Sequence, residues 1–135
     1  LVGNVYFANY AKWIATLTDH YFYGIAPEFY RGIGADGEFV APSSEINHLS
    51  EAMPFDSVLV EMYVSKIYSC GVDLDFEFFL SNGAKGRKLA VARQRLVWVK
   101  RVKNVVHSSS LPSKIVQALL SKVRLTPSNE PFHSS

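Results

Sequence analysis

The spacing of apolar residues changes once along the chain, which divides it into a helical part and a strand part. From Val5 to Tyr23 there is no proline or glycine, and apolar residues recur every three or four positions, at Tyr6, Tyr10, Trp13, Leu17 and Tyr21. This spacing predicts one long helix that ends at Gly24. Because the other faces of this helix are also apolar, we expect it to be buried nearly all round.

After a proline- and glycine-containing loop over residues 25–37, with at most one helical turn at 28–31, the spacing becomes an alternation of period two. The alternation predicts strands over residues 58–65, 72–79 and 89–101. An earlier strand near residues 39–49 contains Pro42, which indicates an edge position or a bend. Turn residues separate the strands, at Pro54-Phe55-Asp56, Cys70-Gly71 and Ser81-Asn82-Gly83.

One long helix followed by a run of long strands is an α+β pattern, in which a curved antiparallel sheet wraps round a central helix. A short amphipathic helix over residues 112–124 is expected to follow, with Ile115, Leu119, Leu120 and Val123 on its apolar side. The length of 135 residues and the hydrophobic content of 48% match one compact domain. We assign this domain to residues 1–125 and a flexible tail to residues 126–135.

Composition narrows the range of partners. The formal charge is only +2, and the basic residues are dispersed apart from Lys100, Arg101 and Lys103, which argues against a nucleic-acid partner. The single Cys70 excludes an internal disulfide, and neither a membrane span nor a signal peptide is evident. We therefore expect a cytoplasmic protein that binds no membrane. The chain starts at Leu1 instead of Met, so we also expect residues upstream in the natural polypeptide.

Several common catalytic sites are absent from the sequence. No Gly-x-Ser-x-Gly motif is present, and a lone cysteine such as Cys70 is more often packed than catalytic. The 4 histidines are not placed at metal-ligand spacing, and no phosphate-binding glycine loop occurs. The sequence therefore implies no metal and no cofactor.

The predicted helix carries polar groups at both ends. Asp19 and His20 lie in its last turns, where they point either to solvent or, for Asp19, into a pocket as a base. At the helix start, free backbone N–H groups and the positive end of the dipole are suited to an oxyanion. Tyrosines at helical spacing, such as Tyr6 and Tyr10, are either core residues or part of that site.

The opening run Leu1-Val2-Gly3-Asn4-Val5-Tyr6-Phe7 with Asn9, Tyr10, Lys12 and Trp13 resembles the helix start of the 4-hydroxybenzoyl-CoA thioesterase-like hot-dog family. Within that family, the likeness is closest to the thioesterases of enediyne polyketide biosynthesis. Three more stretches agree, at residues 20–28, 44–62 and 91–95, so the resemblance spans residues 1–101. It implies a single hot-dog domain that hydrolyses acyl thioesters.

The resemblance also implies roles for particular residues. The backbone N–H of Phe7 forms the oxyanion hole, while Asn4, Tyr6 and Tyr10 line the pocket. Many relatives have an Asp, and the enediyne group an Asn, three residues before the glycine that matches Gly3, a position that precedes Leu1. Enediyne enzymes also carry an arginine where this chain has Thr18, and another branch uses an acid on the helix. The catalytic carboxylate is therefore upstream of Leu1, is Asp19, or is absent. We therefore take Phe7, Asn4, Asp19 and Tyr10 as the catalytic set. The proposed substrate wall consists of Tyr6, Asn9, Trp13, Ile14 and Leu17.

The resulting prediction is a thioesterase, without cofactor or covalent nucleophile, that releases a polyketide or other long acyl chain from an acyl-carrier protein or from CoA. The resemblance implies a homodimer or homotetramer with pockets at the subunit interface. Two alternatives remain open. One is a noncatalytic acyl-binding or dimerisation domain of a larger synthase. The other is a hot-dog dehydratase that uses Asp19 and His20. Because these residues are neighbours on a helix, their side chains point about 100° apart.

Overall fold

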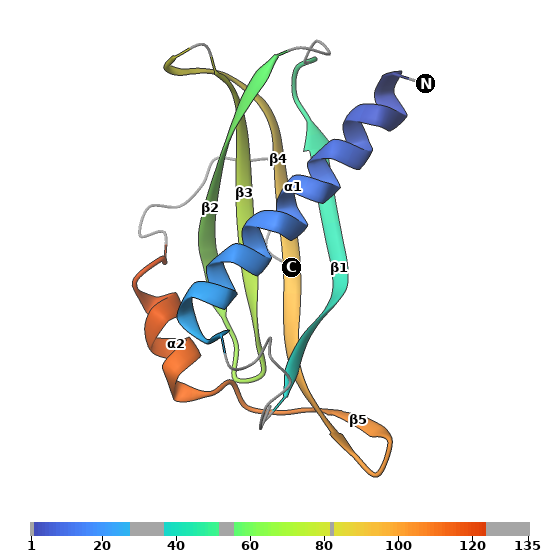
Figure 1. The fold of residues 1–135 in the computed structure, drawn as a ribbon, viewed down its shortest axis with the longest axis vertical. Helices are drawn as coiled ribbons and strands as arrows, with labels where there is room; N and C mark the ends of the chain where they lie inside the picture. The colour runs from blue at the N-terminus through green and yellow to red at the C-terminus, as the bar shows by residue number, and fades with distance from the viewer. Residues whose placement is uncertain (1, 28–36, 52–55, 82, 124–135) are drawn as a thin grey trace.

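The computed structural model describes the backbone of residues 2–27, 37–51, 56–81 and 83–123, and their side chains from Tyr10 onward. It contains one long helix, five strands and one short helix (Figure 1). In chain order they are α1 (Val2–Ile25), β1 (Glu38–His48), β2 (Ser57–Ile67), β3 (Gly71–Ser81), β4 (Lys85–Val102), β5 (Val105–Ser108) and α2 (Ser113–Leu120).

The strands form one antiparallel sheet in the order β1-β4-β3-β2, and β5 pairs with the end of β4. Helix α1 crosses one face of this sheet, and α2 lies beside its C-terminal end (Figure 1). The predicted α+β class, the long first helix and the three later strands are confirmed.

The core lies between α1 and the inner face of the sheet. Alternate residues of β3, among them Leu74, Phe76 and Phe78, point toward α1 and are fully buried. Helix α2 completes this core with Ile115 and Leu119. The predicted apolar side of α2 is correct for these two residues but wrong for Leu120, which is 60% exposed.

Burial of α1 differs from the expectation. Tyr10, Ile14, Thr18 and Phe22 form one buried row with a spacing of four residues. The opposite side, from Ala11 and Lys12 to Thr16 and His20, is exposed within the chain. The prediction of burial nearly all round is therefore wrong for the described chain. Small residues such as Ala11 and Ala15 add to the apolar content of a helix without requiring burial.

Strand β1 matches the expected effect of Pro42. It is the edge strand beside β4, and its register shifts between Val40 and Ser43, around the proline. The β4–β5 hairpin was not predicted. Its turn residues Lys103 and Asn104 both have positive φ, which matches the right-handed twist of the strands.

Some predictions fall on residues that the structure does not describe. These are the helical turn at 28–31, most of the turn at 54–56, and the tail at 126–135. The single-domain assignment to residues 1–125 stays a prediction. No helix in the described ranges is long and apolar enough to cross a lipid bilayer.

Candidate active site

The second half of α1 and the inner faces of β1 and β4 line a partly open cavity of about 410 Å³. We call it the α1–β4 cavity. Its volume falls within the range of about 300–1,000 Å³ that is usual for small-molecule sites. The walls are mainly apolar and include Ala15, Phe22, Phe39, Leu96, Trp98 and Ile115. A hydrocarbon chain fits such walls because its contact surface leaves water on entry.

Four polar side chains interrupt these walls: Thr18, Asp19, Glu38 and Gln94. Glu38 is largely exposed and pairs with Arg101 at 3.4 Å. Gln94 is half-buried and points inward because it alternates with the outward-facing neighbours on β4. Asp19, the only carboxylate of α1, lines the cavity but is exposed, so its position agrees with both predicted readings, and its role as a base stays a prediction.

Thr18 differs from the other three polar residues because it is buried. It is only 7% exposed, and its Oγ1 has no hydrogen-bond partner among the described residues. An unpaired buried hydroxyl costs about 1–3 kcal/mol. Thr18 was noted in the sequence only as a departure from the enediyne enzymes.

Asp19 and His20 are separated by the turn of the helix. Asp19 lines the α1–β4 cavity, whereas His20 lines a wider groove on the other side of α1. This groove has a volume of about 720 Å³ and runs along β2, where Leu17 and Met62 also line it. The two neighbours therefore do not form the acid–histidine pair that the dehydratase alternative requires.

Tyr10 lies in an aromatic cluster and not at the cavity. Its ring is 3% exposed and packs edge-on against Trp13, His48 and Phe78, with ring centroids 5.4, 5.2 and 4.7 Å away. Ile14 is also buried in the core, next to this cluster along α1. The cluster brings His48, from the end of β1, against the first half of α1, a position that the sequence did not indicate.

The remaining predicted residues lie at the start of α1: Asn4, Tyr6, Phe7 and Asn9. Their backbone is helical, and the structure describes none of their side chains. The role of the Phe7 N–H as oxyanion donor stays a prediction.

The nine predicted site residues therefore do not form one cluster within the chain. Phe7 and Asp19 lie about 18 Å apart along the helix axis, at about 1.5 Å per residue. A single thioester carbonyl cannot contact both from the same chain.

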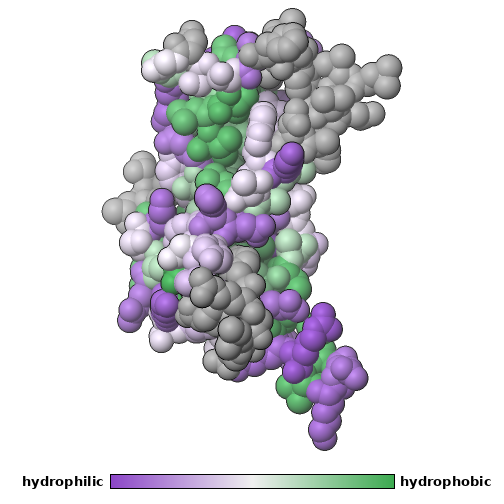
Figure 2. Space-filling model, in the orientation of Figure 1, coloured by the Kyte–Doolittle hydropathy of each residue, from purple (hydrophilic) through white to green (hydrophobic). Residues whose placement is uncertain are grey.

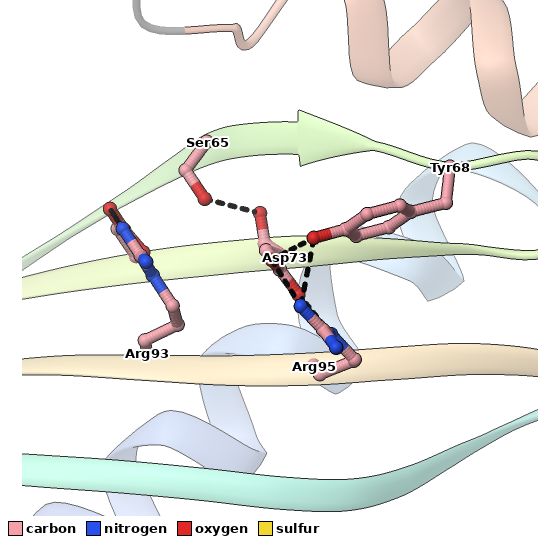
Figure 3. Close-up of polar contacts among 6 residues, drawn as sticks. Ser65, Tyr68, Asp73, Arg93 and Arg95 are labelled. Atoms are coloured by element: carbon pink, nitrogen blue, oxygen red, sulfur yellow. Dashed lines mark hydrogen bonds and ion pairs between the residues drawn. The ribbon is translucent and has the colours of Figure 1, made fainter. Parts of the chain in front are cut away.

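Charged pairs cover the opposite face of the sheet (Figure 3). Asp73, Asp75 and Glu77 alternate with the core residues of β3, and each is 9% exposed or less. Arg95 Nε contacts Asp73 Oδ1 at 2.9 Å, and Arg93 Nε contacts Asp75 Oδ1 at 2.7 Å. The register of β3 and β4 places these partners directly opposite each other.

Tyr68 completes the first of these pairs. Its hydroxyl donates to Asp73 Oδ2 at 2.6 Å and accepts from Arg95 Nη2 at 2.8 Å (Figure 3). Burial acts to raise the pKa of Asp73, but hydrogen bonds from Arg95 and Tyr68 outweigh it, so the pKa lies below its usual value. Since these groups face away from the cavity, the two arginines of residues 91–95 support the sheet, and only Gln94 of that stretch reaches the cavity.

Comparisons with known proteins agree with this architecture. The family model of the thioesterase-like superfamily matches residues 1–120. A search of curated protein sequences finds no match. Among solved structures, the dynemicin thioesterase, whose crystal structures reveal effects of polyene binding, has a TM-score of 0.78 and 21% identity over 89% of this chain and 85% of its own.

Two CoA-related structures are also similar. A 1,4-dihydroxy-2-naphthoyl-CoA thioesterase from Synechocystis has a TM-score of 0.68 and 15% identity over 84% of this chain and 81% of its own. A thioesterase from Thermus thermophilus, seen with coenzyme A and zinc, has a TM-score of 0.66 and 19% identity over 83% and 80%. These matches confirm the predicted hot-dog fold.

Proposed function

The chain belongs to the thioesterase-like superfamily, and from this we propose that it hydrolyses thioesters of a long, apolar acyl chain, of polyketide type, carried by an acyl-carrier protein or by CoA. The observation that carries the proposal is the α1–β4 cavity, whose apolar walls suit the acyl chain and at which Asp19 lies. The polyene bound by the dynemicin thioesterase supports a long chain, and the coenzyme A complex from Thermus thermophilus supports a CoA carrier.

In the proposed reaction, water adds to the thioester carbonyl carbon, and the carbon–sulfur bond then breaks to give a carboxylic acid and a free thiol. Asp19 accepts a proton from the attacking water and returns it to the leaving sulfur. Backbone N–H groups at the start of α1 stabilise the oxyanion, with Phe7 as the donor that the resemblance implies. Asn4 and Tyr6 lie in the same part of the helix and orient the thioester there.

The distance between Phe7 and Asp19 supports a homodimer or a homotetramer. Phe7 and Asp19 are about 18 Å apart along one helix. A thioester that contacts both residues therefore contacts Phe7 of one chain and Asp19 of a second chain. Within the described ranges, the edge strand β1 pairs with β4 alone, so its other side offers an edge for a second copy to extend the sheet. Mixing Asp19→Asn chains with Asn4→Ala chains is then expected to restore activity that neither variant has alone.

The direct test is thiol release by the full-length protein from a panel of acyl-CoA and acyl-carrier thioesters. Asp19→Asn is expected to lower kcat about 100-fold, since general base catalysis contributes about 10²–10⁴-fold. His20→Gln is the matched control, because His20 is the exposed neighbour that lies in the β2 groove. Equal rates in both variants would remove Asp19 from the mechanism.

Absence of hydrolysis by the wild-type protein across the whole panel would overturn the thioesterase proposal. Acyl-pantetheine binding without turnover, unchanged in Asp19→Asn, would instead favour the noncatalytic acyl-binding domain.

A further inference from the structure

We propose that the α1–β4 cavity takes an acyl chain that carries a keto or hydroxyl oxygen along its length, and that the Thr18 hydroxyl donates a hydrogen bond to this oxygen. The inference rests on the proposed function, because it names the class of acyl group that the enzyme releases. It concerns an oxygen of the acyl chain and not the thioester carbonyl.

In the buried row Tyr10, Ile14, Thr18 and Phe22, Thr18 is the one polar residue among aromatic and aliphatic side chains. Its Oγ1 has no partner among the described residues, although valine has nearly the same shape and would leave no unpaired group. Buried polar groups in native proteins are nearly always hydrogen-bonded, so an exception requires an explanation. A ligand oxygen that reaches Thr18 supplies the missing partner.

The hydroxyl can reach a ligand by rotation of one bond. In the ligand-free chain Oγ1 is shielded from the open space, while Thr18 as a residue lines the cavity. Threonine on a helix populates two χ1 rotamers. Oγ1 makes no hydrogen bond to a described residue in its present rotamer. A change of rotamer that turns the hydroxyl toward the cavity therefore breaks no such bond.

The surroundings of Thr18 match an isolated oxygen on a hydrocarbon chain. Gln94, on the facing strand β4, offers an amide donor and acceptor to the same oxygen. Next to them, Phe22, Leu96 and Ile115 are apolar and suit the methylene groups on either side. One cavity of about 410 Å³ thus has both polar and apolar wall residues.

The test compares saturated acyl thioesters with a series of equal length in which a hydroxyl group is moved along the chain. We expect one position to give the highest kcat/KM. Thr18→Val should lower kcat/KM for that substrate about five- to tenfold, the usual effect of one hydrogen bond, and leave the saturated substrate unchanged. Thr18→Ser should retain the preference, and Thr16→Val is the matched control on the exposed side of α1.

A second measurement separates this role from a structural one. Because Thr18→Val removes an unpaired buried hydroxyl, we expect the melting temperature of the free protein to rise by about 3 °C. A fall in melting temperature, or an equal loss of activity on saturated and hydroxylated substrates, would overturn the proposal.

Calorimetric binding of the free hydroxy acid and its saturated counterpart requires no turnover. If the protein hydrolyses nothing but binds the hydroxy acid more tightly through Thr18, the thioesterase proposal fails and the oxygen site stands. If hydrolysis occurs without any preference for a hydroxyl position, the oxygen site fails and the thioesterase proposal stands.

Discussion

Replacing Asp73 by asparagine tests whether the charged pairs on the outer face hold the sheet together. The Asp73 side chain is 5% exposed and accepts three hydrogen bonds, from Arg95 Nε at 2.9 Å, Arg95 Nη2 at 3.1 Å and the Tyr68 hydroxyl at 2.6 Å. Breaking a fully buried pair costs about 3–5 kcal/mol. Since the Arg95 side chain is 45% exposed, water hydrates it after the change, and we expect a loss of about 2–3 kcal/mol.

The assay is urea unfolding at pH 7 combined with thermal melting. A loss of this size lowers the melting temperature of a chain of this length by about 7–10 °C. Glu38→Gln is the control, because its pair with Arg101 is long and both side chains are more than half exposed, and it should cost less than about 0.5 kcal/mol. An equally small loss in Asp73→Asn would refute a stabilising role for the pair.

The pH dependence follows from the lowered pKa of Asp73, which hydrogen bonds from Arg95 and Tyr68 produce against the opposing effect of burial. A carboxyl group whose pKa is lower in the folded state contributes its full stability above the unfolded pKa and loses it as the pH falls through the folded value. The stability difference between the wild type and Asp73→Asn should therefore be constant near pH 7 and shrink below about pH 4.

Three further substitutions probe the packing. Gly71→Ala should cost about 1–3 kcal/mol in urea unfolding, because the added Cβ would meet the Leu96 carbonyl oxygen on β4. Ile115→Ala should cost about 2–5 kcal/mol and enlarge the α1–β4 cavity, since Ile115 is 1% exposed and lines it. Leu120→Ala, at a site that is 60% exposed on the same helix, should change stability by less than about 0.5 kcal/mol, measured in the same way.

The strands could be predicted because their alternation is set by local geometry. In β3, residues 72–79 alternate strictly between core and outer face, and the sequence located this strand within two residues at each end. The alternation in the sequence predicted that the acidic residues of β3 lie on the outer face. It did not predict which basic residues pair with them. Arg93 and Arg95 meet Asp75 and Asp73 only through the register of β3 and β4, which depends on tertiary pairing.

The projecting β4–β5 hairpin shows another limit of prediction from sequence. It combines Lys100, Arg101 and Lys103 with Val102, Val105 and Val106, all exposed, and Figure 2 shows it as a largely hydrophilic projection with some hydrophobic surface. The sequence showed the basic cluster, but it did not predict the turn between β4 and β5. Lys-Asn is not among the glycine-containing pairs that mark such a turn, although both residues have the positive φ that it requires.

The candidate site was hardest to predict because it depends on the rotation of α1 about its own axis. Successive residues turn by about 100°, which sends Thr18 into the core, Asp19 to the cavity and His20 to the opposite groove. The angles between these three side chains follow from their positions in the sequence. The rotation of α1 about its axis depends instead on which row of residues packs against the sheet. That row is Tyr10, Ile14, Thr18 and Phe22. A threonine within a row of aromatic and aliphatic residues is the signal that would have identified Thr18, because burial of an unpaired hydroxyl costs stability that ligand binding can recover.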